Sequence, residues 1–518
     1  MTSRASSFLA ATSIFTVLSL AAAARGQALE QQYVTPTSGS TTEYFGQSVA
    51  TQGDRMVVGC PNDDAAAHDG GSVHVWRFDP TIGDWVFAQQ LFASDAQYGA
   101  NFGWSVALDG DLIVVSALGQ STSLGAYSGQ AYVFRYDATS KSWKEEQKLL
   151  PSIGKTNDEF GKSVAVRGDR ILIGASSSDT PAGNDSGCAF VYRYQDPTTK
   201  WVEEARLIDA NAAMDDHAGR AVALDGVTAV VSRSLADAGA LDQGAVSIFT
   251  RSGTNWSQTD ELQITPTHSF TDFGECVAIQ GDTIVAGAPG QDQGTTVADV
   301  GWIHVFEFNG SAWLETVALM NPNPAASSYF GKSGVALAGN LLVVGHPDDD
   351  ANGKADAGSA WVYRHGQQSG WVYDGHLEAS DGQAFDRFGQ SVAASSEHIL
   401  CGAPKHDSKV AFDWGVVYGY AAAPITLTID PPNPAPAQAI TFAAFRGAPG
   451  SPVMLTIEDV SGTPVFLPLF VAAFGSDEAF TFTANAPNPA YGLHVGMRAW
   501  KINSTGTLAH SALAYVDL

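Results

Sequence analysis

The chain has 518 residues, of which 45% are hydrophobic and 16% are charged, a composition that excludes a disordered protein and suffices for two or three folded domains. It carries 27 Lys and Arg residues against 54 Asp and Glu residues, so its formal net charge is −27. Because so acidic a polymer repels other polyanions, the charge argues against nucleic acid and anionic membrane surfaces as partners.

Residues 1–28 have the pattern of a secretory signal peptide. Arg4 supplies the positive charge, an uncharged run rich in Ala and Leu follows, and Gly26 and Ala28 fit the small residues that precede a cleavage site. The alternative is an uncleaved N-terminal anchor. No later segment reaches the ~20 apolar residues that a membrane-spanning helix needs. We therefore expect a secreted or cell-surface protein with no membrane span in the mature chain.

One repeat occupies the sequence from residue 29 to residue 421. Phe-Gly pairs recur every 55–58 residues, and Ala218-Gly219 fills the one position where the Phe is replaced. The six intact pairs begin at Phe45, Phe102, Phe160, Phe273, Phe330 and Phe388. A fixed period of this length defines seven repeated structural units. Helical repeats would show a 3.6-residue periodicity, which the sequence lacks.

Each unit contains four short apolar stretches joined by turns, which is the pattern of a β-propeller blade. The first two stretches are separated by a two-residue turn such as Gly53-Asp54. The fourth runs from a Trp to a Leu six positions later, as from Trp85 to Leu91, so both side chains face the same side of a strand. A stretch of the fourth kind precedes the first unit, at residues 28–34, and none follows the seventh. We therefore predict a seven-bladed propeller whose N-terminal strand completes the seventh blade and closes the ring.

The second stretch of several units ends in Gly-Ala-Pro, intact at Gly287-Ala288-Pro289 and Gly402-Ala403-Pro404. With the preceding Phe-Gly pairs, this pattern resembles the FG-GAP repeats of integrin α-subunit propellers and of many bacterial surface proteins. The resemblance implies a role in adhesion or ligand binding. Several units depart from it: Ser116-Ala117-Leu118 and Ser232-Arg233-Ser234 replace Gly-Ala-Pro, and Ala218 replaces the Phe. We expect these blades to be looser or altered locally. The calcium loop that the family often carries between the first two strands is not expected here, because a two-residue turn cannot wrap the ion.

The loop between the second and third stretches carries a pair of Asp residues in six of the seven units. The pairs are Asp64 and Asp69, Asp179 and Asp185, Asp237 and Asp242, Asp292 and Asp299, Asp350 and Asp356, and Asp407 and Asp413, whereas the second unit has Ser121 and Tyr127. All these loops should emerge on one face of the ring. The functional interpretation is an acidic rim that binds divalent cations or a basic partner. The structural alternative is that Asp side chains hydrogen-bond to the loop backbone in Asx turns.

One of these loops has the spacing of a calcium site. Asp348, Asp350, Asn352 and Asp356 would supply oxygen ligands, and Gly353 would allow the sharp turn. Calcium is therefore the candidate cofactor, with turn formation as the alternative. No other cofactor is indicated.

From about residue 422 the composition changes to a Pro-rich linker followed by short alternating apolar runs, such as the one beginning at Pro452. These runs predict an immunoglobulin-like β-sandwich over residues 422–518. The expected fold is thus all-β, with a signal peptide at 1–28, a propeller at 29–421 and a sandwich at 422–518.

No catalytic constellation emerges from the sequence. The four cysteines, Cys60, Cys188, Cys276 and Cys401, lie in predicted buried strands without CxxC spacing, which favours small core residues over disulfides or a zinc site. We therefore expect a monomeric secreted or cell-surface binding protein that takes a protein or glycan ligand on its acidic loop face. The alternatives are an extracellular hydrolase or lyase that acts on polysaccharide through carboxylates of that face, and a structural component of the cell envelope.

Overall fold

The computed structural model describes residues 30–36, 42–195, 200–265, 267–294, 297–322, 324–366, 370–407 and 412–422, together with strands between residues 426 and 517. The signal-peptide prediction falls on residues 1–28, which lie outside the described residues.

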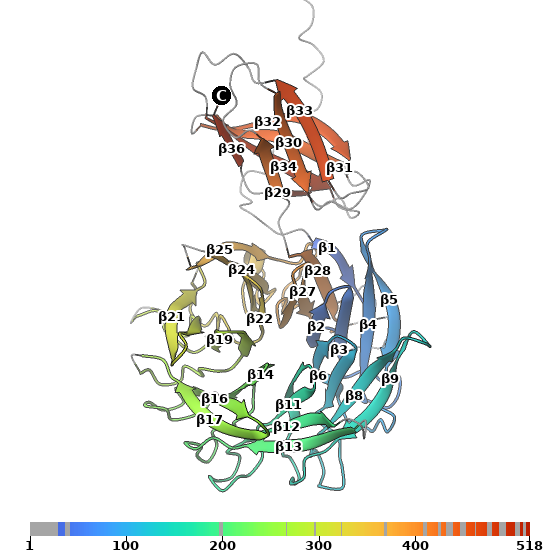
Figure 1. The fold of residues 1–518 in the computed structure, drawn as a ribbon, viewed down its shortest axis with the longest axis vertical. Helices are drawn as coiled ribbons and strands as arrows, with labels where there is room; N and C mark the ends of the chain where they lie inside the picture. Colours follow the sequence, from blue (N-terminus) through green and yellow to red (C-terminus); the bar gives the residue numbers. More distant parts are fainter. Residues whose placement is uncertain are drawn as a thin grey trace, which may run out of the picture.

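Seven four-stranded antiparallel sheets form a ring around a central axis (Figure 1). Blade 1 contains β2 (Ser48–Gln52), β3 (Arg55–Cys60), β4 (Ser72–Asp79) and β5 (Asp84–Leu91), and blade 2 contains β6 (Phe102–Asp109), β7 (Leu112–Ala117), β8 (Gln130–Asp137) and β9 (Ser142–Leu149). Blade 3 contains β10 (Phe160–Arg167), β11 (Arg170–Ala175), β12 (Cys188–Gln195) and β13 (Lys200–Leu207), and blade 4 contains β14 (Val222–Asp225), β15 (Thr228–Arg233), β16 (Ala245–Ser252) and β17 (Asn255–Leu262). Blade 5 contains β18 (Val277–Gln280), β19 (Thr283–Ala288), β20 (Trp302–Phe308) and β21 (Trp313–Met320), and blade 6 contains β22 (Val335–Ala338), β23 (Leu341–His346), β24 (Ser359–Gly366) and β25 (Gly370–Leu377).

The seventh blade joins the two ends of the propeller. It contains β26 (Ser391–Ala394), β27 (His398–Ala403) and β28 (Val416–Ala421), and its outer strand is β1 (Glu30–Val34). β1 runs antiparallel to β28, with Val34 opposite Val417. This pairing is the ring closure that the sequence predicted. Closure protects strand edges that an open sheet would expose to solvent.

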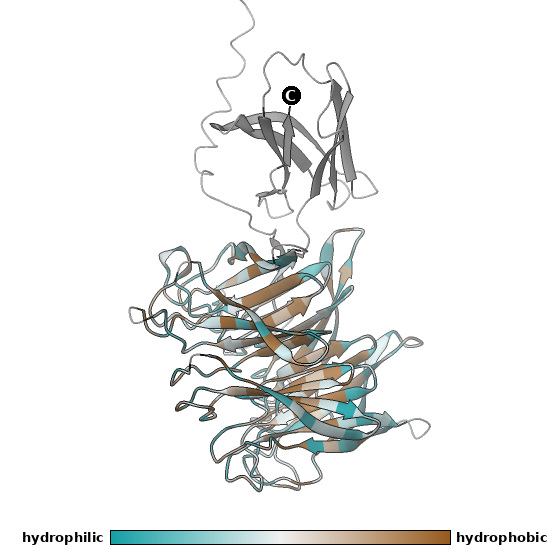
Figure 2. Cartoon of the chain, turned by 60° about the vertical axis from the view of Figure 1, so that its left-hand side comes forward, coloured by the Kyte–Doolittle hydropathy of each residue, from teal (hydrophilic) through white to brown (hydrophobic). Residues whose placement is uncertain are grey.

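The core lies within and between the blades, where the second strands and the first half of the third strands are buried (Figure 2). All six Phe side chains of the Phe-Gly pairs are 0% exposed. Each packs edge-on against its own blade, as Phe102 does against Tyr132 at a centroid distance of 5.3 Å and Phe160 against Phe190 at 5.6 Å. Burial of each ring stabilises the fold by roughly 2–3 kcal/mol of transfer free energy. The repeated Phe is therefore a packing residue.

Blade 4 replaces this aromatic packing by a buried ion network. It has Ala218 in place of the Phe and Ser247 in place of Tyr132 or Phe190, the third residue of the third strand. Arg233 occupies the position of the Gly-Ala-Pro alanine, which in blade 2 is the cross-strand partner of the Phe. Its guanidinium, 3% exposed, lies 3.2 Å from Asp209, 2.8 Å from Asp216 and 2.6 Å from Glu261. Blade 4 is thus altered locally: it has the large Arg233 and the small Ala218 where blade 2 has Ala117 and Phe102.

The four cysteines are free and buried, as the sequence predicted. Among the described residues, no helix is long and apolar enough to cross a membrane.

The C-terminal strands form two antiparallel sheets, in agreement with the predicted sandwich. One sheet contains β29 (Thr426–Asp430), β30 (Ala439–Phe445) and β33 (Ala479–Asn485). The other contains β31 (Pro452–Val460), β32 (Thr463–Ala473), β34 (His494–Ile502), β35 (Leu508–His510) and β36 (Ala514–Asp517).

Candidate binding face

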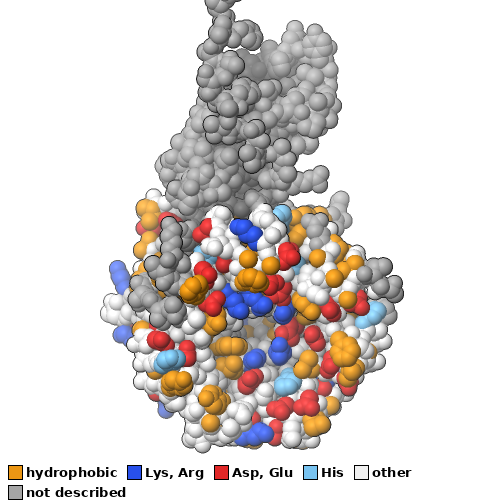
Figure 3. Space-filling model, turned by 180° about the vertical axis from the view of Figure 1, so that it is seen from behind, with side chains coloured by type: hydrophobic (Ala, Val, Ile, Leu, Met, Phe, Trp, Pro, Cys, Tyr) orange, Lys and Arg blue, Asp and Glu red, His pale blue; other side chains and the backbone are white. Residues whose placement is uncertain are grey.

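The loops between the second and third strands emerge on one face of the ring, where they meet the connections that lead into the next blade. We call this the loop face (Figure 3). In blade 1, for example, the carbonyl of Asp69 accepts a hydrogen bond from the Asn101 amide of the following blade at 3.0 Å. Gly71 forms an isolated parallel β-bridge with Phe102. Gly103 is required beside it, because a Cβ there would lie 2.5 Å from the Ser72 carbonyl oxygen and its φ is 97°. The junction between blades is therefore built from backbone contacts that recur around the ring.

The Asp pairs hold these loops closed. In each of the six pairs the first carboxylate accepts a hydrogen bond from the backbone amide of the second Asp, at 2.8–3.1 Å. In blade 2 the Ser121 hydroxyl takes the same role toward Tyr127 at 3.3 Å. The second residue of every pair has a φ of 47–52°, a left-handed conformation that Asp tolerates better than most residues. The first Asp of each pair thus closes its loop through a bond to an amide five to seven residues later, a longer span than the two residues of an Asx turn. The carboxylates are distributed around the ring, with one pair in each of six blades.

The four predicted calcium ligands point to different partners in the structure. Asp348 is 2.8 Å from the Lys332 ammonium and 3.2 Å from the Arg387 guanidinium, and its side chain is 10% exposed. Asp350 accepts from the Asp356 amide at 3.1 Å, and Asn352 donates to the carboxylate of Glu378. These residues surround a short 3₁₀ turn, Ala351–Gly353. Calcium at this loop stays a prediction.

Sequence reasoning missed a second group of metal-ligating side chains on this face. In blade 1 the His68 imidazole lies 2.8 Å from Asp69 and 3.9 Å from Asp64, and all three side chains are accessible. The Asp pattern pointed to this loop, but nothing in the repeat indicated that the intervening His turns back toward the pair. A comparable group, Cys60 with Asp63 and His74, is fully buried.

The positions that flank the Phe-Gly pair lie at or just before the start of the innermost strand of each blade, on the loop face, and we call this region the channel mouth. The residue before the Phe has a φ of 50–56° in every blade; the seven are Tyr44, Asn101, Glu159, His217, Asp272, Tyr329 and Arg387. The second residue after the Phe is half-buried in every blade; the seven are Gln47, Trp104, Lys162, Arg220, Glu275, Lys332 and Gln390. Basic side chains gather around the central hollow (Figure 3). The two sets include four basic residues, Lys162, Arg220, Lys332 and Arg387, on a face that the Asp pairs alone would make acidic.

Each mouth cation lies near a carboxylate or an aromatic ring. Lys162 lies 3.4 Å from Glu159 and its ammonium is 5.4 Å from the centroid of Trp104. Arg220 bonds to Glu275 at 2.7 Å. Because these cations are partly desolvated, their interactions with carboxylates and aromatic rings are stronger than those of fully solvated charges.

Asp272 is the mouth carboxylate with the most altered acidity. Burial and the nearby charge of Glu275 raise the pKa of Asp272 to about 6, and the Arg220 guanidinium opposes the increase. A carboxyl group with this pKa exchanges protons near neutral pH, which is the property of a general acid or base.

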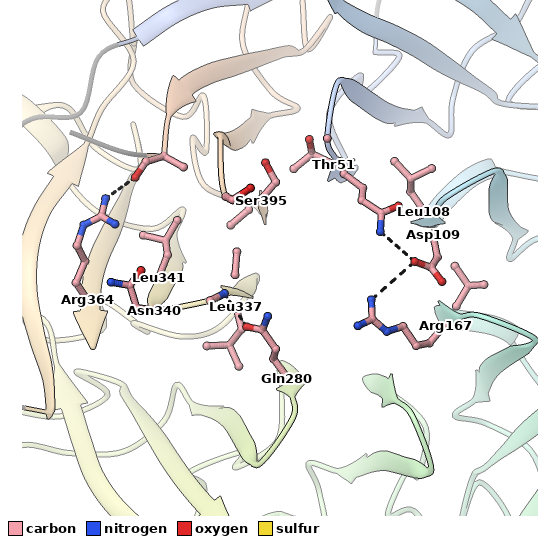
Figure 4. Close-up of a pocket in the computed structure, with 18 residues that line it drawn as sticks. Thr51, Leu108, Asp109, Arg167, Gln280, Leu337, Asn340, Leu341, Arg364 and Ser395 are labelled. Carbon is pink, nitrogen blue, oxygen red and sulfur yellow. Dashed lines mark hydrogen bonds and ion pairs between the residues drawn. The ribbon is translucent and has the colours of Figure 1, made fainter. Parts of the chain in front are cut away.

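The opposite end of the channel has a different construction (Figure 4). Here the residue before the hairpin turn contacts the next blade in blades 1–5; for example, Gln52 donates to Asp109 at 3.0 Å, and Arg167 donates to Asp225 at 3.1 Å. Ala338 has no polar side chain to continue this chain of contacts. A cavity of about 630 Å³ occupies this end of the channel, and residues of blades 1, 2, 3, 5, 6 and 7 line it, Ala338 among them. Gln52, Asp109 and Arg167 line this cavity and also hold adjacent blades together.

Comparison with known proteins agrees with this architecture. The family model for the FG-GAP repeat matches seven segments, residues 29–76, 85–134, 143–192, 201–249, 256–306, 313–363 and 371–420. The chain belongs to the FG-GAP repeat family. Each matched segment contains the outer strand of one blade and the three inner strands of the next, so the FG-GAP unit and the blade are offset by one strand. The first unit supplies β1 to blade 7.

Solved structures similar to this FG-GAP protein are distant. Sqt1 of Saccharomyces cerevisiae matches with a TM-score of 0.41 and 10% identity, over 90% of this chain and 100% of that one. The periplasmic gluconolactonase PpgL of Pseudomonas aeruginosa matches with a TM-score of 0.37 and 14% identity, over 65% of this chain and 86% of that one. A search of curated proteins finds none that matches this chain.

Proposed function

We propose that this protein is an extracellular recognition protein that binds its partner on the loop face, over the channel mouth. The observation that carries the proposal is the contrast between constant and varying positions of the repeat. The Phe-Gly pair and the Asp pair recur and form the junctions between blades, whereas the mouth positions differ from blade to blade. Folding does not require that variety, so we attribute it to recognition.

The expected activity is adhesion at a cell surface after removal of residues 1–28, with a protein or glycan as partner. The mouth combines cations, carboxylates and aromatic rings, a mixture that suits a polar partner with several contact points. Calcium at residues 348–356 would add regulation, because a bound ion would compete with Lys332 and Arg387 for Asp348.

The test is retention of the labelled mature chain on intact cells of the producing organism and on immobilised extracellular polysaccharides. A variant with Lys162, Arg220 and Lys332 replaced by Ala should lose retention at least tenfold while its far-ultraviolet circular dichroism stays unchanged. The matched control is Arg167→Ala at the opposite end of the channel, which should be retained like the wild type. Equal retention of the triple variant, or a loss confined to Arg167→Ala, would place recognition elsewhere.

A second candidate function, cleavage of polysaccharide, is favoured by one observation: Asp272, with its pKa raised to about 6, lies in the mouth next to Glu275. Release of reducing or unsaturated sugar ends from soluble polysaccharides, absent in Asp272→Asn, would support it. Binding without release of such ends would leave recognition as the function.

A further inference from the structure

Three residues before each Phe, the backbone takes a left-handed conformation in all seven blades. The φ angles are 57–72°, and the residues are Thr42, Gly99, Asn157, Asp215, Phe270, Ser327 and Phe385. Five of them have small or short polar side chains, of which Gly, Asn and Asp suit this conformation well. Two are phenylalanines. A bulky aromatic residue in this region is a conformational outlier.

Neither Phe is explained by packing. Phe270 is 56% exposed and Phe385 is 59% exposed. Their amides donate at 2.8 Å to the carbonyls of Leu241 and Ala355, so each backbone is fixed at a junction between blades while its ring stands in solvent. Folding would be served better by Asn, which blade 3 has at Asn157 with a φ of 65°. Strain that folding does not need points to a function for the side chain.

The other junctions present exposed apolar side chains on the same loops. Tyr98 is 74% exposed and stacks on His68 at a centroid distance of 5.1 Å, and Tyr127, Met214, Leu241 and Phe412 are 52–72% exposed. The residue that follows His68, Leu241 or Phe412 is the second Asp of its pair. On the loop face the hydrophobic side chains form separate patches around the hollow, with acidic side chains among them (Figure 3). Exposed apolar groups beside carboxylates therefore recur from blade to blade.

This arrangement fits a carbohydrate chain. An aromatic ring packs against the C–H face of a pyranose, and an adjacent carboxylate accepts hydrogen bonds from sugar hydroxyls. Separate, repeated contact units suit a repeating polymer, whereas a protein–protein interface has a closely packed central core that is more apolar than its polar rim. The net charge of −27 repels acidic polysaccharides. We infer that Phe270, Phe385 and Tyr98 form stacking sites for a neutral polysaccharide on the loop face. This inference rests on the proposed function and names the class of ligand.

The test uses the mature chain with soluble dextran, galactomannan and xyloglucan in affinity electrophoresis. The wild type should be retarded by at least one of these neutral polymers. The double variant Phe270→Asn and Phe385→Asn should lose at least tenfold in affinity while its melting temperature stays equal or rises. The matched control Ile82→Asn removes a side chain that is 63% exposed on the β4–β5 hairpin, at the other end of the blade, and should bind like the wild type.

Three results would overturn the inference: no retardation by any neutral polymer, unchanged retardation of the double variant, or binding of poly-lysine alone. The last would identify a basic protein as the partner. Recognition at the mouth is judged separately, by retention of the Lys162, Arg220 and Lys332 variant on cells, so the loss of one proposal does not remove the other.

Discussion

Replacement of Arg233 by Ala should destabilise the propeller more than any replacement of an exposed cation. The guanidinium is 3% exposed and contacts carboxylates of Asp209, Asp216 and Glu261 that are 1%, 5% and 15% exposed. Its removal leaves these buried carboxylates without their cation, a loss of about 3–5 kcal/mol. For a ring of about 390 residues the unfolding entropy is about 0.8 kcal/mol/K, so the melting temperature should fall by about 5 °C.

The destabilisation of Arg233→Ala should also depend on pH, in a direction that the buried carboxyl groups determine. Burial raises the pKa of Asp209 even with Arg233 present, and without the cation these carboxyls will bind protons more readily in the folded state than in the unfolded state. Protonation removes the uncompensated charge, so the deficit of the variant should be larger at pH 8 than at pH 5. Arg233→Lys should recover only part of the loss, because one ammonium cannot reach three separated carboxylates in the way that a planar guanidinium does.

Thermal and urea unfolding of the wild type, Arg233→Ala and a matched control would measure these differences. The control is Arg135→Ala, whose side chain is 32% exposed and pairs with Asp111 and Glu146. It should cost less than about 1 kcal/mol. Equal losses in the two variants, or a deficit of Arg233→Ala that does not change with pH, would refute the argument that the network replaces aromatic packing in blade 4.

Three further predictions concern ring closure, acid stability and calcium. Val34 is 3% exposed on the closing strand, so Val34→Asp should lower the free energy of unfolding by at least about 3 kcal/mol, whereas Val34→Ile should change it little. Equal melting temperatures of the two variants would mean that β1 does not stabilise the ring. Burial lowers the pKa of His398 to about 4, so the unfolded state binds the proton more tightly and stability should fall by up to about 3 kcal/mol as the pH drops from 6.5 to 4. His398→Gln should flatten that dependence in urea titrations at stepped pH. Millimolar calcium should raise the melting temperature relative to chelator, with the rise lost in Asp350→Ala, and no rise would leave the loop carboxylates as turn residues.

The sequence predicted the number of blades and the closing strand because both depend on spacing within one chain. A stretch at residues 28–34 has the offset from Phe45 that the fourth strand has from the next Phe, and no such stretch follows residue 421. One strand is therefore missing and one is spare, and only closure of the ring combines them. The same spacing located the Asp pairs. It could not choose between cation ligands and Asx turns, because both use Asp at the same offsets. The backbone φ and the hydrogen bonds at 2.8–3.1 Å give their carboxylates a turn-closing role.

The mouth could not be predicted from one repeat at a time. Lys162 and Lys332 lie in different blades, and each looks like an ordinary surface residue within its own unit. Ring closure brings them to one axis, and no pattern in the sequence states how far each side chain extends toward it. Arg233 was recognised only as a departure from Gly-Ala-Pro, since its three carboxylates come from the β13–β14 connection and the outer strand β17.

Folding and recognition act on different positions of the same loops. The junction between two blades needs a left-handed residue before the Phe, a Gly after it and a closed loop on the preceding blade, and the backbone meets these needs in all seven blades. At the left-handed position three residues before the Phe, Phe270 and Phe385 are more than half exposed, so the side chain there can vary without loss of the ring. A residue that folding disfavours, such as Phe270, is therefore informative where a favoured one, such as Asn157, is not. The strained aromatic positions and the mouth cations are for this reason the residues on which a search for the partner should concentrate.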